Sequence, residues 1–354
     1  MHTVTLIPGD GIGPEVTASA RAIADAAGAG IAWEVMAAGQ RVGEETGNPL
    51  PPAVFESFLR NRVALKGPTG TPFGTEYKVV ASHPALDGST APRTYPSVAI
   101  ALRKEFALYM NVRPSKNYAG VRTRFSDVDL VIFRENSEDL YLGIERQVSA
   151  DRAEATKVIT RGATERAARF ACEYMLKTGR KRLTIAHKSN VLKKTDGLFL
   201  RTAQEVAARY PGIECDSRVI DALCMELVVR PESFDCLLLP NLYGDIVSDL
   251  TAGLVGGLGV APGANLGEGY AMFEAVHGTA PDIAGQDRAN PTSILLSTVM
   301  MLRYLGEAKA ADRMEAAIAQ VLRDGRDVTA DLGGKGGTRR MTDAIVSAIG
   351  HGKA

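Results

Sequence analysis

The regular alternation of short apolar runs with helical segments is the feature that most constrains how this chain can fold. The runs at 4–8, 63–68 and 235–240 have the length of strands, and the chain between such runs repeatedly carries helix signals. A helix between two neighbouring strands returns the chain, so the strands run parallel and the helices cover the faces of the sheet. The sequence therefore predicts an α/β fold of the doubly wound type.

The stretch 241–249, Asn-Leu-Tyr-Gly-Asp-Ile-Val-Ser-Asp, is the strongest candidate for a site. It follows an apolar strand and leads into a predicted helix at 246–255. Asp245 and Asp249 are then i,i+4 neighbours near the helix start, where like charges repel and the helix dipole offsets only part of the repulsion. Two solvated acids would be the simpler interpretation. The end of an apolar strand is, however, where open α/β sheets bind ligands, and oxygen ligands suit Mg²⁺ or Mn²⁺.

Composition excludes several classes of function. The chain has 354 residues, enough for two packed lobes. Lys+Arg and Asp+Glu both number 41, so no net field attracts nucleic acid or an anionic membrane. The longest apolar runs, such as 294–302, are too short to span a bilayer. The four cysteines lack C-x-x-C spacing and indicate a reducing compartment, and the N-terminus runs straight into a strand, so we expect a cytoplasmic protein.

Three arginines fall on one predicted helix and two neighbouring predicted strands. These are Arg103, Arg113 and Arg134. Any one of them alone would be interpreted as a surface charge or an ion-pair partner. Three that converge in a chain without net charge suit a polycarboxylate ligand, since a guanidinium pairs with carboxylates through two parallel hydrogen bonds.

Other strand ends also carry polar groups. Lys188 follows the apolar strand that begins at 183, Asp221 ends a predicted strand at 218–221, and Tyr141 lies in a polar turn. Lys188 could be a solvated surface lysine. At the carboxyl end of a strand, facing arginines and a metal, it would be a useful acid or base.

Several segments lack clear periodicity. We interpret 68–96 as a long surface loop, which in a compact domain tends to be functional or mobile. The segment 145–160 is strand-like and charged, and we expect an exposed arm. The small residues from 277 to 290 would allow close backbone approach to a flat or phosphate-bearing ligand. The glycines at 9–13 lack the spacing of a dinucleotide fingerprint and indicate only a tight strand-to-helix turn.

Taken together and in this order, several motifs resemble those of the β-decarboxylating dehydrogenases, which act on isocitrate, homoisocitrate, 3-isopropylmalate, tartrate or D-malate. The resemblance covers nearly the whole chain and is greatest to the NAD-dependent isocitrate dehydrogenases of the tricarboxylic acid cycle. It implies a large, cofactor-side domain from 1–96 and 258–354. It also implies a smaller central α/β domain, 97–257, with the substrate and metal site and the dimer interface. The motifs that carry it are 7–15, 109–114, 134–141, 187–190, 241–249 and 277–290.

The resemblance also implies roles for individual residues, in a site shared between the subunits of a homodimer or a higher homo-oligomer. Tyr141 would protonate the enol left by decarboxylation, and Lys188, supplied by the partner, would deprotonate the substrate hydroxyl. The tricarboxylate substrate would contact Ser97, Arg103, Arg113, Arg134 and Asn190. Mg²⁺ or Mn²⁺ would be held by Asp245 and Asp249 with Asp221 supplied by the partner. The cofactor would contact Thr71, Glu274, His277, Gly278, Asp282, Ile283 and Asn290.

The pair Asp282-Ile283 predicts NAD as the cofactor. A carboxylate accepts a hydrogen bond from a ribose 2′-hydroxyl and repels a 2′-phosphate. Relatives that prefer NADP carry Lys-Tyr at this place, and the stretch 331–340 offers no clear equivalent of their further Tyr and Arg.

The substrate is predicted to be isocitrate, with homoisocitrate and 3-isopropylmalate as alternatives. Ser97 matches the isocitrate enzymes, whereas Ala99 replaces their usual asparagine; Arg93 and Tyr95 could supply a replacement contact, which would equally favour homoisocitrate. A non-catalytic regulatory subunit is the alternative of a different class. Such subunits usually lose an acid/base group or an arginine, and here all are present. Dimer against tetramer, and Mg²⁺ against Mn²⁺, stay open.

Overall fold

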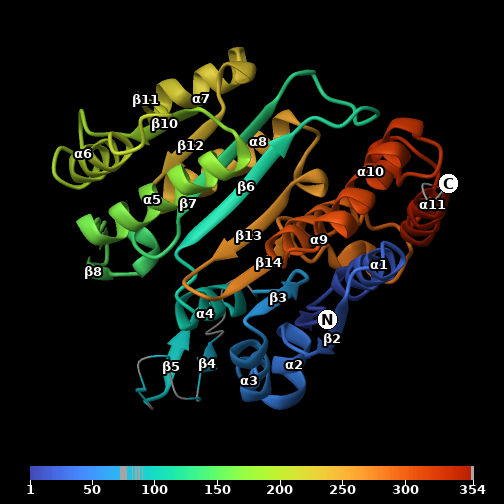
Figure 1. The fold of residues 1–354 in the computed structure, drawn as a ribbon. Helices are drawn as coiled ribbons and strands as arrows, with labels where there is room; N and C mark the ends of the chain where they lie inside the picture. Colours follow the sequence, from blue (N-terminus) through green and yellow to red (C-terminus); the bar gives the residue numbers. More distant parts are fainter. Residues whose placement is uncertain (72–77, 82, 84–85, 87, 90, 352–354) are drawn as a thin grey trace. The chain divides into compact units, whose positions relative to one another are not determined.

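The computed structural model describes residues 1–71, 78–81, 83, 86, 88–89 and 91–351. These residues form two compact units. Unit 1 comprises Met1–Leu108, Tyr118–Thr123 and Gly256–Ala354, and unit 2 comprises Tyr109–Asn117 and Arg124–Val255. Both chain ends thus belong to unit 1 (Figure 1). The sequence-based boundary after residue 96 lies before helix α4 (Val98–Glu105), which is part of unit 1.

The strands of unit 1 pair in the order β13-β14-β3-β1-β2. All of these pairs are parallel except β13 with β14, which is antiparallel. The register places Lys66 directly opposite Glu274, at the carboxyl ends of β3 and β14. The strands are β1 (His2–Ile7), β2 (Ile31–Val35), β3 (Val63–Lys66), β13 (Pro262–Leu266) and β14 (Ala271–Ala275).

Helices cover both faces of the unit 1 strands. Successive residues of a strand point to opposite faces, and Met272 packs in a core cluster with Phe58 of α3 and Leu102 of α4. The ring of Phe273 lies on the other face, with its centroid 5.8 Å from that of Tyr304 in α9. The helices are α1 (Gly13–Ala26), α2 (Gln40–Thr46), α3 (Pro52–Asn61), α4, α9 (Thr292–Tyr304), α10 (Ala308–Asp324) and α11 (Thr338–His351).

The turn between β1 and α1 requires its glycines. Gly11 has φ 57°, and a Cβ atom there would lie 2.0 Å from the carbonyl oxygen of Thr279. The carboxylate of Asp10 accepts hydrogen bonds of 2.8 Å from the backbone N–H groups of Gln40 and Gly70. The predicted tight turn is therefore also a junction that holds two other loops at the carboxyl end of β1.

The strands of unit 2 pair in the order β11-β10-β12-β7-β6. The first four run parallel, so their carboxyl ends share one edge, and β6 is antiparallel to β7. The strands are β6 (Met110–Lys116), β7 (Asp129–Glu135), β10 (Arg182–His187), β11 (Glu214–Val219) and β12 (Cys236–Leu239).

Unit 2 is covered on both faces in the same way. The ring of Phe133 in β7 has its centroid 5.2 Å from that of Tyr174 in α5, whereas the next residue, Arg134, contacts α8 on the opposite face. The predicted doubly wound α/β class is thus confirmed in both units. The helices are α5 (Arg161–Thr178), α6 (Thr195–Ala207), α7 (Ile220–Val229) and α8 (Asn241–Leu254). The short 3₁₀ helices of the two units are η1 (Asp139–Leu142), η2 (Pro231–Ser233), η3 (Leu258–Val260), η4 (Pro281–Ile283) and η5 (Ala330–Leu332).

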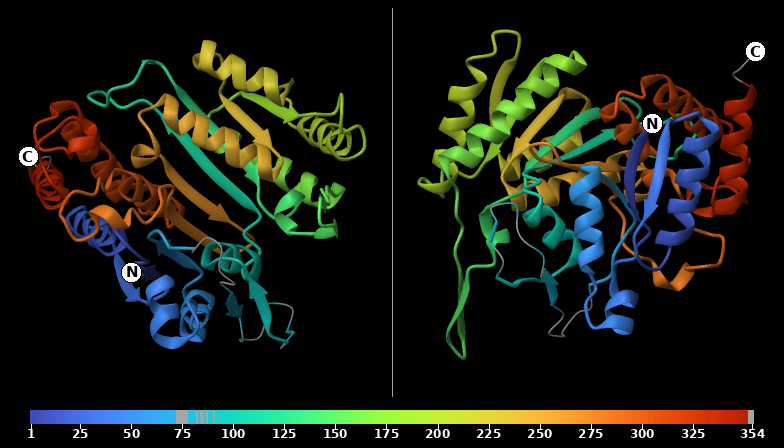
Figure 2. Two further views of the ribbon diagram at one scale, coloured as in Figure 1. Left: turned by 180° about the vertical axis from the view of Figure 1, so that it is seen from behind. Right: turned by 60° about the horizontal axis from the view of Figure 1, so that its bottom comes forward.

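A two-stranded hairpin projects from the body of unit 2 (Figure 2, right). It is formed by β8 (Glu145–Ser149) and the antiparallel strand β9 (Arg152–Ala155), and most of its side chains are exposed. The prediction of a charged, strand-like arm in this segment is confirmed.

Some elements differ from those predicted. Helix α8 begins at Asn241 rather than at 246, so Asp245 lies in its second turn. Strand β11 begins at Glu214, before the predicted strand at 218–221. Within the predicted loop at 68–96, β4 (Val79–Ala81) and β5 (Arg93–Tyr95) form an antiparallel ladder, and other parts of that loop lie outside the described residues.

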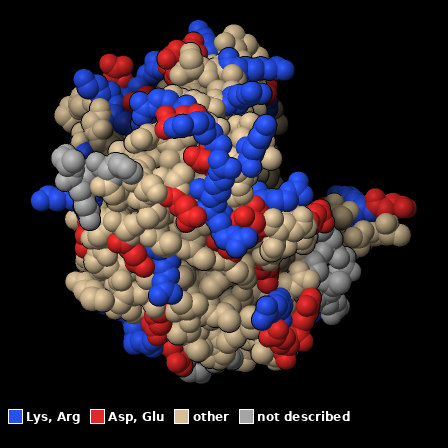
Figure 3. Space-filling view, turned by 90° about the vertical axis from the view of Figure 1, so that its right-hand side faces the viewer, with Lys and Arg blue, Asp and Glu red and all other residues tan. Residues whose placement is uncertain are grey.

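The surface charges and the helix hydropathy of the structure agree with what the composition predicted. On the face drawn in Figure 3, acidic and basic side chains lie intermingled. Within the described part of the chain, we find no helix that combines the length and the apolar character needed to cross a bilayer.

Candidate active site

Three predicted site residues meet in unit 2, at the carboxyl end of β7. Arg134 is 1% exposed, and its Nε donates a hydrogen bond of 2.9 Å to Oδ1 of Asn241. Its guanidinium pairs with one carboxylate oxygen of Asp245, and the other oxygen accepts a hydrogen bond from the Tyr141 hydroxyl. The guanidinium carbon of Arg134 also lies 4.9 Å from the centroid of the Tyr141 ring. Asp245 therefore joins the expected substrate arginine to the expected proton donor.

Close packing of α8 on β7 at this point depends on Gly244. A Cβ atom at Gly244 would lie 2.5 Å from Cγ and 2.7 Å from Cβ of Arg134. No side chain larger than hydrogen fits there unless Arg134 moves.

We expect Gly244→Ala to lower both stability and activity, although alanine favours helices. The overlap with the buried Arg134 should cost about 1–3 kcal/mol of unfolding free energy, measurable by urea denaturation. Gly253→Ala, in the same helix and with no atom within 4 Å of its Cβ position, should be neutral or stabilise by up to about 1 kcal/mol. An alanine at 244 as harmless as the one at 253 would contradict the packing described.

A second ion pair lies on the same helix. Nη1 of Arg113 is 3.0 Å from Oδ1 of Asp249 and donates a hydrogen bond of 3.0 Å to the Ser248 hydroxyl. Burial raises the pKa of Asp249, as does the charge of Asp245, whereas Arg113 lowers it. The predicted like-charge pair is thus present. Because α8 begins four residues before Asp245, neighbouring arginines, and not the helix dipole, offset the repulsion.

The remaining acid/base candidates lie at the ends of β10 and β11. Nζ of Lys188 is 2.5 Å from Oδ1 of Asp221, which is the second residue of α7. The side chain of Asp221 is 69% exposed, and Asn190 is exposed in the turn after β10. Among the described residues of this single chain, no three His, Cys, Asp or Glu side chains are grouped closely enough to hold a metal ion.

Arg103 lies in unit 1, where it joins a buried charge cluster. Its Nη2 donates a hydrogen bond of 2.7 Å to Oε1 of Glu274, and Nζ of Lys66 is 2.8 Å from Oε2 of the same carboxylate. Asn265 donates a further bond of 2.7 Å to Oε1. Burial alone would raise the pKa of Glu274, but the charges of Lys66 and Arg103 outweigh it and hold the pKa far below its usual range. Glu274, a predicted cofactor contact, thus also orients Arg103.

Replacing Glu274 with glutamine should destabilise the protein because it leaves the buried Lys66 ammonium without a counter-charge. We expect a loss of about 3–5 kcal/mol at pH 7, measured by chemical denaturation. The depressed pKa means that the stabilisation is complete above the unfolded pKa of about 4.3 and is lost as the pH falls below it. The wild type should therefore lose stability more steeply than Glu274→Gln on acidification below pH 4.3, and parallel pH profiles would contradict this.

The predicted cofactor residues of unit 1 lie on two segments. Thr71 is exposed on the segment that follows β3. Gly278 and Asp282 are exposed on the segment that follows β14, where Ile283 ends η4. Burial lowers the pKa of the neighbouring His277 imidazole. Asn290 is buried and donates a hydrogen bond of 2.9 Å to Asp331.

Polar side chains at the start of α4 and in β5 already have hydrogen-bond partners within the chain. The hydroxyl of Ser97 caps this helix by accepting a hydrogen bond of 3.2 Å from the N–H of Ile100. Arg93 donates two bonds, of 2.7 and 2.8 Å, to the carboxylate of Glu105, which also accepts a bond from the Tyr95 hydroxyl. Arg93 and Tyr95 therefore anchor β5 to α4, a role that the sequence did not suggest.

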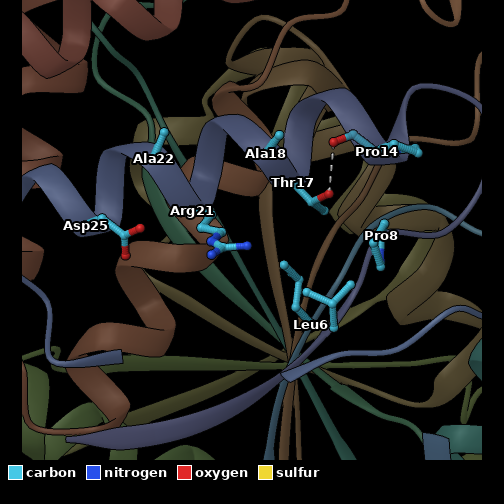
Figure 4. A pocket seen from close by; sticks show the side chains of 9 residues that line it. Leu6, Pro8, Pro14, Thr17, Ala18, Arg21, Ala22 and Asp25 are labelled. Atoms are coloured by element: carbon cyan, nitrogen blue, oxygen red, sulfur yellow. Dashed lines mark hydrogen bonds between the residues drawn. The ribbon is translucent and has the colours of Figure 1, made fainter. Parts of the chain in front are cut away.

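Sequence reasoning missed several polar residues around these groups. Lys66 ends a buried strand, and the rule that found Lys188 would have found it. Asn241 directly follows the predicted strand at 235–240, so the same rule would have found it as well, whereas Asp10 lies inside the glycine turn and was not singled out. A recess of about 370 Å³ along α1 (Figure 4), whose lining includes Thr17, Arg21 and Asp25, contains none of the predicted residues.

Comparisons with known proteins agree with the geometry. Residues 3–345 match the family model described as isocitrate/isopropylmalate dehydrogenase. The chain is 45% identical over 350 residues (99% of this chain, 92% of the relative) to a mitochondrial regulatory subunit of the NAD isocitrate dehydrogenase of Dictyostelium discoideum. It is 47% identical over 344 residues (97% and 87%) to mitochondrial catalytic subunit 5 of the same enzyme in Arabidopsis thaliana. A crystal structure of isocitrate dehydrogenase from Methylococcus capsulatus superposes with a TM-score of 0.90 at 45% identity, covering 99% of both chains.

These relatives correct one prediction. The expected cytoplasmic location is wrong, because the similar curated proteins are named as mitochondrial subunits. Free cysteines report a reducing compartment without saying which one.

The resemblance and the fold class inferred from the sequence are confirmed by a family match over almost the full length and by the superposition. The chain belongs to the isocitrate/isopropylmalate dehydrogenase family.

Proposed function

We propose that this protein is itself a catalyst of the NAD-dependent oxidative decarboxylation of isocitrate to 2-oxoglutarate and CO₂. The observation that carries this proposal is the Arg134–Asp245–Tyr141 cluster with Arg113 and Asp249 beside it. Sequence identity does not separate catalytic from regulatory relatives, since one of each kind is similar to this chain. The retained acid/base groups and arginines favour the catalytic role.

Substrate binding follows from the charges on neighbouring strands. Arg113 and Arg134 bring two guanidinium groups to α8, and guanidinium pairs well with carboxylates. Asn241 and Asp245 fix the orientation of Arg134, so it is positioned before the substrate arrives. Arg103, which Glu274 orients, and Ser97 are the other substrate contacts that the family resemblance implies.

Proton transfer follows from the pKa values and the hydrogen bonds. Burial raises the pKa of Tyr141, and the hydrogen bond to Asp245 raises it further, so the phenol keeps its proton and can donate it. Lys188 of the partner subunit, in its neutral amine form, accepts the proton of the substrate 2-hydroxyl. NAD⁺, when bound, would supply the hydride acceptor for C2. The C–C bond to the β-carboxylate then breaks, CO₂ leaves, and the bonding electron pair stays on the substrate as an enol. The carbon that lost CO₂ takes the proton of Tyr141.

The acidic residues fit a divalent cation. Asp245 and Asp249 lie one turn apart, and part of the rise in the Asp249 pKa comes from the negative charge of Asp245, which a cation would relieve. We infer that they hold Mg²⁺ or Mn²⁺ together with the partner subunit's Asp221. A bound cation would polarise the hydroxyl and carboxylate oxygens of the substrate.

A shared site requires an oligomer, and unit 2 has a suitable surface. Met225, Val228 and Val229 of α7 and Ile246 of α8 are each more than half exposed. The two helices contact each other and carry Asp221, Asp245 and Asp249. Exposed apolar side chains grouped in this way mark an association surface, so we infer a homodimer or a higher homo-oligomer in which the site spans two chains.

Kinetics of the purified chain, expressed alone with Mg²⁺ or Mn²⁺, test the proposal. We expect isocitrate to be preferred over homoisocitrate and 3-isopropylmalate by more than about 100-fold in kcat/KM. NAD⁺ should be preferred over NADP⁺, because Asp282 would repel a 2′-phosphate. Turnover confined to another acid would replace isocitrate with that substrate, and an inactive chain that stimulates an active homologue would show a regulatory role.

A further inference from the structure

A lysine that neither the sequence motifs nor the proposed chemistry uses lies where three elements of unit 2 meet. Nζ of Lys157 is 2.8 Å from Oδ1 of Asp196 and 3.5 Å from Oδ1 of Asp139. Both aspartates have an exposed fraction of zero. One ammonium group thus balances two buried carboxylates, and the loss of such a counter-charge is costly.

The first carboxylate holds the turn that carries Tyr141. Asp139 begins η1, and its Oδ2 accepts a hydrogen bond of 3.0 Å from the N–H of Leu242 in the first turn of α8. Its own N–H donates to the carbonyl of Val158, next to Lys157, at 2.9 Å. Asp139 has φ 73°, a strained value for a residue with a side chain, so these contacts hold it in place.

The second carboxylate holds the strand end that carries Lys188. Oδ2 of Asp196, at the start of α6, accepts a hydrogen bond of 2.7 Å from the backbone N–H of Lys188. Nζ of Lys157 also lies 4.4 Å from the centroid of the Tyr243 ring, two residues before Asp245. The ammonium therefore contacts groups that lead to Tyr141, to Lys188 and to the acidic face of α8.

We propose that Lys157 is a positioning residue that holds the Tyr141 turn and the Lys188 strand end in one arrangement. The inference rests on the proposed function, because it assigns Tyr141 to the chain's own site and Lys188 to the site of its partner. Without the ammonium, the two carboxylates would repel each other, and the hydrogen bonds from Leu242 and Lys188 would lengthen or break. One side chain would then set the geometry of both half-sites.

The test compares Lys157→Met, which removes the charge and keeps much of the length, with Lys157→Arg, which keeps the charge. Lys177→Met, an exposed site on α5 of the same unit, controls for the loss of a lysine. At a temperature where circular dichroism shows each variant folded, Lys157→Met should lower kcat about 100-fold. Its KM for isocitrate should change by only a few-fold, since the arginines remain. Lys157→Arg should retain at least about a tenth of the wild-type kcat, and Lys177→Met should match the wild type.

Hydrogen exchange supplies a readout that does not depend on the reaction. In Lys157→Met, amide exchange measured by mass spectrometry should quicken in the peptides that contain Lys188 and Leu242, and should stay unchanged in unit 1. Unchanged exchange in these peptides would overturn the proposal, as would quickened exchange with a wild-type kcat. If the wild-type chain does not oxidise isocitrate, the proposed function fails, and the exchange result alone decides whether Lys157 holds the two turns.

Discussion

Tyr141→Phe should lower kcat by about 10²–10³-fold while leaving the KM for isocitrate nearly unchanged. The ring remains, so its contact with the Arg134 guanidinium is kept, and only the hydroxyl that donates to Asp245 is lost. Since that hydroxyl is the inferred proton donor to the carbon left by CO₂, its removal slows a step after substrate binding. Steady-state kinetics with isocitrate and NAD⁺ measure the change.

The matched control for this substitution is Tyr210→Phe, which removes a tyrosine hydroxyl after α6 in the same unit. It should leave kcat unchanged. A Tyr141→Phe protein with full kcat would show that another group delivers the proton, whereas a large rise in KM alone would show that Tyr141 serves only in binding.

Asp245→Asn should be more damaging, lowering kcat/KM on the order of 10³-fold or more. The substitution removes the charge that balances the buried Arg134, one of the two carboxylate oxygens that accept from Arg134 and Tyr141, and one of the three acids expected to hold a cation. The apparent affinity for Mn²⁺, measured by titrating activity and by fluorescence or calorimetry, should fall together with activity.

Asp127→Asn, in an exposed segment before β7, makes the same chemical change away from the site and should be silent. Circular dichroism and a melting curve separate loss of function from loss of folding, because leaving Arg134 without its ion-pair partner should also cost up to about 3 kcal/mol. Wild-type affinity for Mn²⁺ in folded Asp245→Asn would remove Asp245 from the metal site.

Much of the fold could be predicted from the sequence because buried strands are continuous apolar runs and amphipathic helices repeat about every 3.6 residues. The elements that were not predicted lack such a pattern. Helix α2 buries none of its residues, so it has no apolar stripe. Strand β13 begins with Pro262 and Gly263, which are unfavourable in strands, yet four of its five residues are buried. The start of helix α8 was predicted too late because its first turn, Asn-Leu-Tyr-Gly, includes a glycine, which is unfavourable inside a helix.

Some residues of the candidate site could likewise be predicted from the sequence, and others could not. Residues at strand ends, such as Arg134 and Lys188, could be predicted because parallel strands place their carboxyl ends at one edge. The ion-pair partners could not. Arg103 and Glu274 are 171 positions apart, and the register of β3 with β14 is what brings Lys66 to the same carboxylate. No local pattern carries such information, and the same holds for Lys157 with its two aspartates.

In the proposed enzyme, each active site takes Tyr141 from one chain and Lys188 from another. Tyr141→Phe and Lys188→Met should each be nearly inactive alone. Co-expressed with different tags and purified through both, the hybrid of a dimer contains one intact site, so it should recover about half of the wild-type activity. A hybrid no more active than either parent would contradict a site shared between chains.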